Sequence, residues 1–412
     1  MDSRTGRLSL AGALAVALVL VVTLPIGGSG RHWGAGTAAG AARPSLFDRA
    51  ALMLQDQAHA LMTGDEKAWT DAVAPALRPR YRQMFRSLRG LGVTQFAYRP
   101  EPLSDPSDTV LSVDANIAYC FSTCSLNGSL DPPDAHQRLT IERSGGRQII
   151  TDMVPLSQED SLEHAPWEDG PLVIRRGARV TVAGPVSETK NLDRVLSIAE
   201  RSATLNDRFA GYLGTPQTRY RVYLADDRAW NTWYGGLAGE NAIGYAMPLN
   251  GYGVDVVLRM SQIGDDRDWL PITVRHEMGH VITLDGADPF RSDQWLAEGI
   301  AEWIGSWPNP ARGGARMPSV RAVLFGPQPP ATIALPSLDE DAPSILVDAF
   351  YGLGQLAVDC MARTYGQPAM FDFVKGVLQE GNTLDVASVR AFNKPFPVVD
   401  QGCVRWIKEQ AG

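Results

Sequence analysis

One short stretch of the sequence, His276-Glu277-Met278-Gly279-His280, combines residue types that bind metal ions with one that can accept a proton. In a helix, residues four apart lie on the same face, so His276 and His280 can direct both imidazoles at one ion. Two such imidazoles suit zinc, and Glu277 lies beside them without competing for the same coordination position. The spacing therefore predicts a zinc site in which Glu277 takes a proton from water as general base.

The residues around this stretch favour a buried helix. Pro271 could open the helix and Gly286 could close it, and the intervening side chains next to the motif are uncharged except Arg275. The chain has only 6 histidines in 412 residues, so chance is a poor explanation for two of them at this spacing with a glutamate between.

A catalytic zinc usually takes three protein ligands, and the best third candidate is Glu298. Glu298 lies in a second expected helix, with Asp293 as its N-cap and Gly305 as its end. Glu302, one turn further on, shares the face of Glu298 and could accept a hydrogen bond from the second nitrogen of His276. The alternative for Glu302 is a solvated charge. Asp285 and Asp288 are minor alternatives for the third ligand.

The two helices together resemble the gluzincin metallopeptidases, a family that includes thermolysin and aminopeptidase N. The similarity covers about residues 191–412 and is specific at His-Glu-x-x-His and at the Glu-Gly-x-Ala-Glu that starts at Glu298. The resemblance implies that His276, His280 and Glu298 bind zinc and that Glu277 is the base. The segment between the two helices is shorter than in aminopeptidase N relatives.

The resemblance also implies a tyrosine hydroxyl that assists the oxyanion. Tyr351, in Tyr351-Gly352-Leu353-Gly354, is similar to the tyrosine of the Tyr-x-x-Gly segment of aminopeptidase N relatives. Tyr351 is expected to open a helix that Gly366 closes, and the alternative is a core aromatic residue. The other hydroxyls that could act in its place belong to Tyr245, Tyr252 and Tyr365.

One substrate-binding feature of aminopeptidase N relatives is missing. Their Gly-Ala-Met-Glu-Asn strand holds the free amine of the substrate through its glutamate, whereas the corresponding residues 245–250 contain none. This omission argues against amine-anchored exopeptidase action. The apolar run Val254–Met260 is expected to be a buried strand that could pair with an extended peptide substrate.

Along the chain, the pattern predicts an α+β protein with two folded domains. Residues 44–183 read as helices, broken at Thr63-Gly64-Asp65, followed by short β-like runs, and they resemble the cone-shaped domain of the nuclear transport factor 2-like superfamily. Residues 184–412 begin with an amphipathic helix from about Lys190 to Leu213 and form the zincin-like part. We expect the remaining histidines of the first domain to be ordinary polar residues: His59, His136 and His164.

Residues 1–43 are expected to be a signal peptide or signal anchor followed by a flexible tether. The apolar run 8–26 follows two arginines and is close to the ~20 residues that span a bilayer, so it could anchor the chain in a membrane. The chain is therefore expected to be secreted or membrane-anchored, with its catalytic part outside the cytoplasm. The four cysteines allow one disulfide in each folded region, and they are Cys120 and Cys124, then Cys360 and Cys403.

The composition fits a folded protein without a nucleic-acid partner. Charged residues make up 20% and the net charge is −8, which leaves no basic face for phosphates. The expected partner is a peptide or protein substrate. Two other functions stay open: a catalytically silent surface binding protein, which would need a fourth protein ligand on its zinc, and a zinc hydrolase of a non-peptide substrate.

Overall fold

The computed structural model describes the chain from Pro44 onward, with short gaps. Residues 44–412 form one compact unit. The expected export segment, with the run 8–26, lies outside the described residues, as do Cys124, Tyr252, Gly286 and Asp288. The described residues are 44–103, 109–121, 133–156, 164–236, 242–249, 253–285, 293–309, 311–339 and 342–412.

The first folded region consists of three helices and an antiparallel sheet. The sheet has the strand order β1-β2-β3-β4, with every neighbouring pair antiparallel. The helices are α1 (Leu46–Thr63), α2 (Glu66–Asp71) and α3 (Arg78–Leu91), and the strands are β1 (Gln95–Pro102), β2 (Val110–Cys120), β3 (Asp134–Ser144) and β4 (Arg147–Pro155).

Local capping explains where the first helices begin and end. Ser45 caps α1 by a capping box with Asp48, in which each side chain accepts a hydrogen bond from the backbone N–H of the other residue. Gly64 ends α1 in the left-handed conformation (φ 84°), and Asp65 then caps α2. The break expected at residues 63–65 is confirmed.

The second region is built on a five-stranded mixed sheet, ordered β5-β6-β7-β9-β8. Strands β6, β7 and β9 run parallel, and the outer strands β5 and β8 are antiparallel to their neighbours. The strands are β5 (Val173–Arg176), β6 (Val180–Gly184), β7 (Tyr220–Ala225), β8 (Gly244–Pro248) and β9 (Val254–Arg259). The domain boundary expected at residue 183 thus falls inside β6.

The expectation that Val254–Met260 offers an edge to a peptide is wrong. This strand, β9, lies between β7 and β8 and pairs with both. The edge strand next to it is β8. This strand contains residues 245–248, part of the segment that lacks the glutamate of aminopeptidase N relatives. Edge position depends on the order of strands in space, which hydrophobicity along the chain does not encode.

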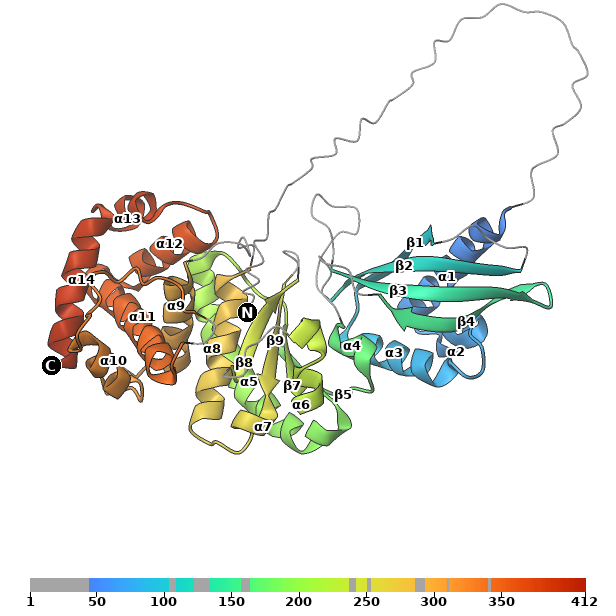
Figure 1. Cartoon of the computed structure of the whole chain (residues 1–412), viewed down its shortest axis with the longest axis horizontal. Helices are drawn as coiled ribbons and strands as arrows, with labels where there is room; N and C mark the ends of the chain where they lie inside the picture. The colour runs from blue at the N-terminus through green and yellow to red at the C-terminus, as the bar shows by residue number, and fades with distance from the viewer. Residues whose placement is uncertain are drawn as a thin grey trace, which may run out of the picture. The chain divides into compact units, whose positions relative to one another are not determined.

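Helices make up most of the chain after β6. Figure 1 shows α5 and α8 beside the five-stranded sheet, and α9 to α14 forming the C-terminal helical part. They are α5 (Thr189–Leu213), α8 (Trp269–Thr283), α9 (Gln294–Ser306), α10 (Met317–Leu324), α11 (Ser344–Tyr365), α12 (Gln367–Leu378), α13 (Leu384–Phe392) and α14 (Phe396–Ala411), with the short helices α6 (Asp227–Trp230) and α7 (Met260–Ile263). One more short helix, α4 (Pro166–Asp169), precedes β5 and packs near α3 of the first region.

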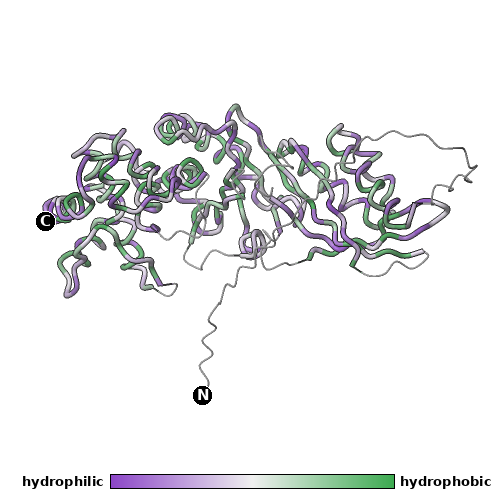
Figure 2. Tube along the Cα trace, turned by 90° about the horizontal axis from the view of Figure 1, so that it is seen from above, coloured by the Kyte–Doolittle hydropathy of each residue, from purple (hydrophilic) through white to green (hydrophobic). Residues whose placement is uncertain are grey.

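Both faces of the five-stranded sheet are buried, each in a different hydrophobic core. Along β7, Val222 belongs to the core of the helical part, whereas Tyr223 belongs to the core that continues into the first region. Strands buried on both faces read as continuous apolar runs, which explains the composition of β9. In Figure 2, hydrophobic and hydrophilic segments alternate along the described helices, as expected when one face packs on a core. The mixed α+β class is confirmed.

A disulfide between Cys360 and Cys403 joins α11 to α14, which is the bridge expected in the C-terminal region. Cys120 is also disulfide-bonded. Helix α11 is long and apolar enough to cross a membrane by length and composition, but 67% of its apolar window is buried inside the fold. Burial in the core accounts for the apolar character of α11.

Candidate metal centre

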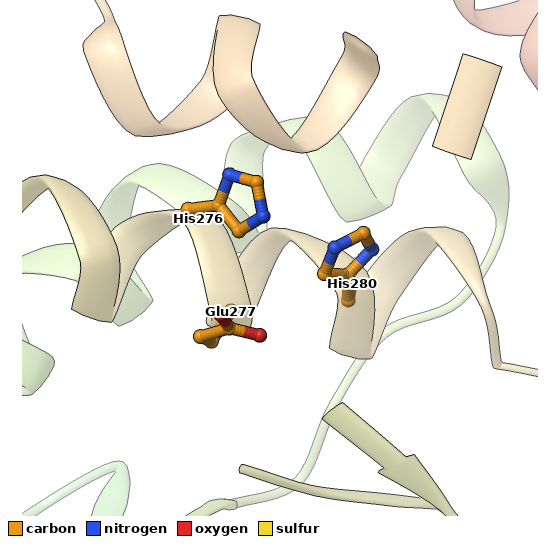
Figure 3. A group of neighbouring side chains, drawn as sticks. All are labelled: His276, Glu277 and His280. Atoms are coloured by element: carbon orange, nitrogen blue, oxygen red, sulfur yellow. The ribbon is translucent and has the colours of Figure 1, made fainter. Parts of the chain in front are cut away.

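Helix α8 places the two histidines side by side. It begins at Trp269, so that Pro271 lies in its first turn, where the missing N–H of proline costs nothing. The rings of His276 and His280 have centroids 4.9 Å apart, and both residues are buried. Figure 3 shows the two imidazoles along one face of the helix, with Glu277 on a different side.

Glu298 of α9 completes a set of three donor atoms. Its Oε2 lies 3.3 Å from Nε2 of His276 and 3.4 Å from Nε2 of His280. Two ligands at usual zinc distances in tetrahedral geometry are separated by about 3.3 to 3.5 Å. The residues therefore fit a zinc ion by donor type and by spacing, and they could hold a metal ion at this point.

Close contacts between α8 and α9 bring these donors together. A Cβ at Gly279 would reach Ala301 of α9 at an ordinary contact distance of 3.5 Å, so the two helices lie one methyl group apart here. Gly305 was expected to end α9, but the helix continues to Ser306 and Gly305 packs on α8 instead. A Cβ at Gly305 would lie 3.2 Å from the Cβ of His276. Small residues thus allow the two helix backbones to approach closely enough for the Glu298 side chain to reach both imidazoles.

The electrostatics of Glu298 suit a metal ligand. Burial alone would favour its neutral form, but the facing His280 and His276 outweigh burial and hold the pKa of Glu298 well below its ordinary value. Glu298 therefore stays ionised at neutral pH, as a carboxylate ligand must.

Glu277 has the opposite environment. It is buried, and burial raises the pKa of its carboxyl from 4.5 to about 8, with the nearby charge of His280 acting in the opposite direction. The backbone of β8 lies against it, since a Cβ added to Gly244 would stand 2.6 Å from Oε1 of Glu277. One donor atom each of His276, Glu277 and His280 lie within 4.8 Å of one another. Glu277 is close enough to the imidazoles to exchange a proton with a molecule held there.

Glu302 is buried, so it is not a solvated surface charge. Its Oε1 lies 3.6 Å from Nδ1 of His276, an ion-pair distance that is longer than a hydrogen bond. The same oxygen accepts hydrogen bonds from Nε and Nη2 of Arg316, at 3.1 and 2.7 Å. The sequence did not point to Arg316. This residue directly precedes α10, and its approach to Glu302 depends on how the segment between α9 and α10 folds back towards α8 and α9.

A cavity of about 500 Å³ opens beside His276 and Glu277, within the range of ligand-binding pockets. Its walls come from the start of α8, the start of β8, α7 and the first turns of α11. Polar and ionisable side chains share the lining with apolar and aromatic ones. The residues are Ala242, Ile243, Gly244, Gln262, Ile263, Asp266, Trp269, Ile272, Thr273, His276, Glu277, Glu302, Arg316, Ser344, Val347, Asp348 and Tyr351.

Tyr351 lines this cavity from α11. The helix begins at Ser344, so the expectation that Tyr351 opens it is wrong, while its end at Gly366 is confirmed. The ring of Tyr351 lies 6.1 Å from the ring of His276. The carboxylate of Glu298, followed by burial, raises the pKa of Tyr351 well above its usual value, so its hydroxyl remains a proton donor.

The alternative residues lie elsewhere. Tyr245 directs its hydroxyl towards the carbonyl oxygen of Trp233 at 3.4 Å, and Tyr365 stacks on Phe392 with ring centroids 4.4 Å apart. Asp285 accepts a hydrogen bond from Gln217 at 2.8 Å. Among the described candidates for the third ligand and for the assisting hydroxyl, Glu298 and Tyr351 are therefore the ones that lie beside the imidazoles.

Neither a protein-family model nor a curated protein matches this chain.

Proposed function

We propose that this chain is a zinc-dependent peptidase of the gluzincin type. The observation that carries the proposal is that Oε2 of Glu298 lies 3.3 Å from Nε2 of His276 and 3.4 Å from Nε2 of His280, separations that suit neighbouring ligands of one zinc ion. When bound, a zinc ion supplies Lewis acidity, which polarises a carbonyl group and activates water at neutral pH.

The chain's own residues then supply the proton transfers. Glu277 is held beside the imidazoles, with one donor atom of each of the three residues within 4.8 Å of the others, where its carboxylate can reach a water molecule bound at the site. In this proposal Glu277 takes the proton of the attacking water and passes it to the leaving amine. Tyr351 lines the same cavity and could donate its hydroxyl proton in a hydrogen bond to the developing oxyanion.

The substrate that fits this arrangement is an extended peptide. Among the described residues β8 pairs only with β9, so its other side is available to main-chain hydrogen bonds. Gly244 at the start of β8 lines the cavity and contacts Glu277, which would bring a peptide paired to β8 next to the base. The segment has no glutamate to hold a free amine, which favours cleavage within a chain over removal of the first residue.

Glu277→Gln provides the test. With a peptide library as substrate, turnover should fall by roughly 10²- to 10⁴-fold, because the amide cannot take the proton, while zinc affinity stays unchanged. Glu409→Gln, at an exposed site on α14, is the matched control. Chelator should abolish wild-type activity and added zinc should restore it. Full activity of Glu277→Gln would refute the assignment of the base.

The same variant distinguishes this proposal from the main alternative, a catalytically silent protein with a structural metal site. Because Glu277 belongs to the group of donors within 4.8 Å, it could instead be a fourth ligand that closes a purely structural site. In that case Glu277→Gln would lower zinc affinity, and the wild-type protein would hydrolyse no peptide in the library.

A further inference from the structure

Arg316 ties together three helices around the metal centre. Two of its nitrogens donate to Oε1 of Glu302 on α9, and Nη1 donates to Oδ1 of Asp348 on α11 at 2.6 Å. Its guanidinium lies over two rings, 4.8 Å from the centroid of Tyr351 and 5.5 Å from that of Trp269 at the start of α8. Its side chain is only 20% exposed and that of Glu302 only 5%, so the contact between these two is shielded from solvent, whereas Asp348 is half exposed.

The charge balance explains why a cation is needed at this position. Three carboxyl groups surround the two imidazoles: Glu277 and Glu302 are buried, and Glu298 is 18% exposed. A divalent ion at the donors Nε2, Nε2 and Oε2 would offset two negative charges but would lie on the far side of His276 from Glu302. A buried carboxylate without a cationic partner is strongly unfavourable, and Arg316 supplies that partner.

We propose that Arg316 is a positioning residue of the metal centre. It holds Glu302 so that the carboxylate faces Nδ1 of His276, and thereby fixes the orientation in which Nε2 faces the metal. Carboxylates on the second nitrogen of a ligand histidine orient the ring and raise its basicity. The inference rests on the proposed function only in that a metal ion binds at His276, His280 and Glu298.

Only one of the two imidazoles has a carboxylate beside its Nδ1. Nδ1 of His280 is buried and has no hydrogen-bond partner among the described residues, whereas Nδ1 of His276 faces Glu302. Arg316 can therefore act on the metal through one imidazole only. Its effect should depend entirely on the presence of the Glu302 carboxylate.

A double-mutant cycle on zinc affinity tests this dependence. Zinc dissociation constants would be measured by chelator competition for the wild-type protein, Arg316→Met, Glu302→Gln and the double variant. Arg316→Met and Glu302→Gln should each weaken zinc binding by about 10- to 100-fold, and the double variant should be no weaker than the Glu302→Gln variant. Arg321→Met is the matched control, because Arg321 donates to the carbonyl oxygen of Ala411, away from the site; its affinity should equal that of the wild type.

Arg316→Lys keeps the positive charge but cannot donate two hydrogen bonds to Oε1 of Glu302 in the same geometry. This variant should therefore lose part of the zinc affinity. It also provides a milder variant if Arg316→Met does not fold, which circular dichroism of the metal-free proteins would reveal. Unchanged zinc affinity in folded Arg316→Met overturns the inference, as does an equal loss in the Glu302→Gln background. If the wild-type protein itself binds no zinc, the proposed function fails instead.

Discussion

Two regions of the molecule bury histidines among carboxylates, and they differ in what lies between the donor atoms. On the four-stranded sheet, Nδ1 of His136 lies 3.1 Å from both carboxylate oxygens of Asp114. Its Nε2 lies 3.0 Å from the amide nitrogen of Asn116 and 3.2 Å from Asp134. Both ring nitrogens thus have polar partners on the neighbouring strand β2, and Nε2 has a further one on β3 itself.

At the α8–α9 site, by contrast, two imidazoles approach one atom. Nε2 of His276 and Nε2 of His280 lie 3.3 and 3.4 Å from the same carboxylate oxygen of Glu298. The ring nitrogens of His136 face three different side chains, whereas both imidazoles of the α8–α9 site face one shared oxygen. Convergence of several potential ligand atoms on one point, and not the mere presence of His and Asp or Glu, distinguishes a candidate metal site.

The largest expected effect is loss of metal binding. His280→Ala should abolish stoichiometric zinc, because two donors are too few for a structural or catalytic site, whereas His136→Ala should keep one zinc per chain. Elemental analysis after dialysis measures this directly. Zinc at 100 times the dissociation constant should also stabilise the wild type and His136→Ala by about 2.7 kcal/mol, and not His280→Ala. Loss of zinc from His136→Ala would erase the distinction between the two clusters.

The next comparison concerns one buried carboxyl group in each region. Burial raises the pKa of Glu168 to about 7 and that of Glu277 to about 8, from 4.5. Between pH 4.5 and these raised values, the folded protein therefore binds more protons than the unfolded chain. The free energy of unfolding of the metal-free protein should fall as the pH rises from about 4.5 to 8. Glu168→Gln should remove its own share of this fall, which ends near pH 7, whereas Glu277→Gln should remove a share that continues to about pH 8.

Urea unfolding of the metal-free protein at a series of pH values measures these slopes. In the presence of zinc, the contribution of Glu168 should persist unchanged, because it belongs to α4 and accepts its hydrogen bonds from Gln137 and Ala165, in the first region. A pH profile that neither variant alters would show that burial does not control these two groups.

The smallest expected effect concerns glycines at helix contacts. A Cβ at Gly299 of α9 would lie 2.6 Å from the backbone of Gly354 in α11, so Gly299→Ala must separate two helices of the site and should cost about 1 to 3 kcal/mol. A Cβ at Gly90 of α3 would meet only the terminal methyl of Ile174, 2.5 Å away, which can rotate. Gly90→Ala should be close to neutral, because alanine also favours the helix. Thermal unfolding distinguishes the two, and equal losses would contradict this account.

Much of the local structure could be predicted from the sequence because it depends on short-range periodicity. The amphipathic pattern from Lys190 to Leu213 predicts a helix, and α5 spans Thr189–Leu213. The four-residue spacing of His276 and His280 places both imidazoles on one face of α8 wherever that helix packs. The glycine end of α11 at Gly366 is likewise a local signal.

The remaining features depend on contacts between distant segments. The prediction of the edge strand was wrong. Strands β8 and β9 differ in their position within the sheet, and no local sequence pattern records that position. Gly305 was expected to end a helix and instead allows α8 to approach α9. No spacing pattern marks Arg316, whose guanidinium reaches Glu302 only after α9, α10 and α11 have packed.

The sequence by itself determined the chemistry at hand: two imidazoles and a carboxylate on one helix, and two further carboxylates one turn apart on the next. Only the tertiary structure decided that Glu298 meets both imidazoles, that Glu277 lies against β8, and that Arg316 balances Glu302. The physical reason is that helix periodicity fixes directions within one element, whereas distances between elements follow from how their side chains and glycines pack together.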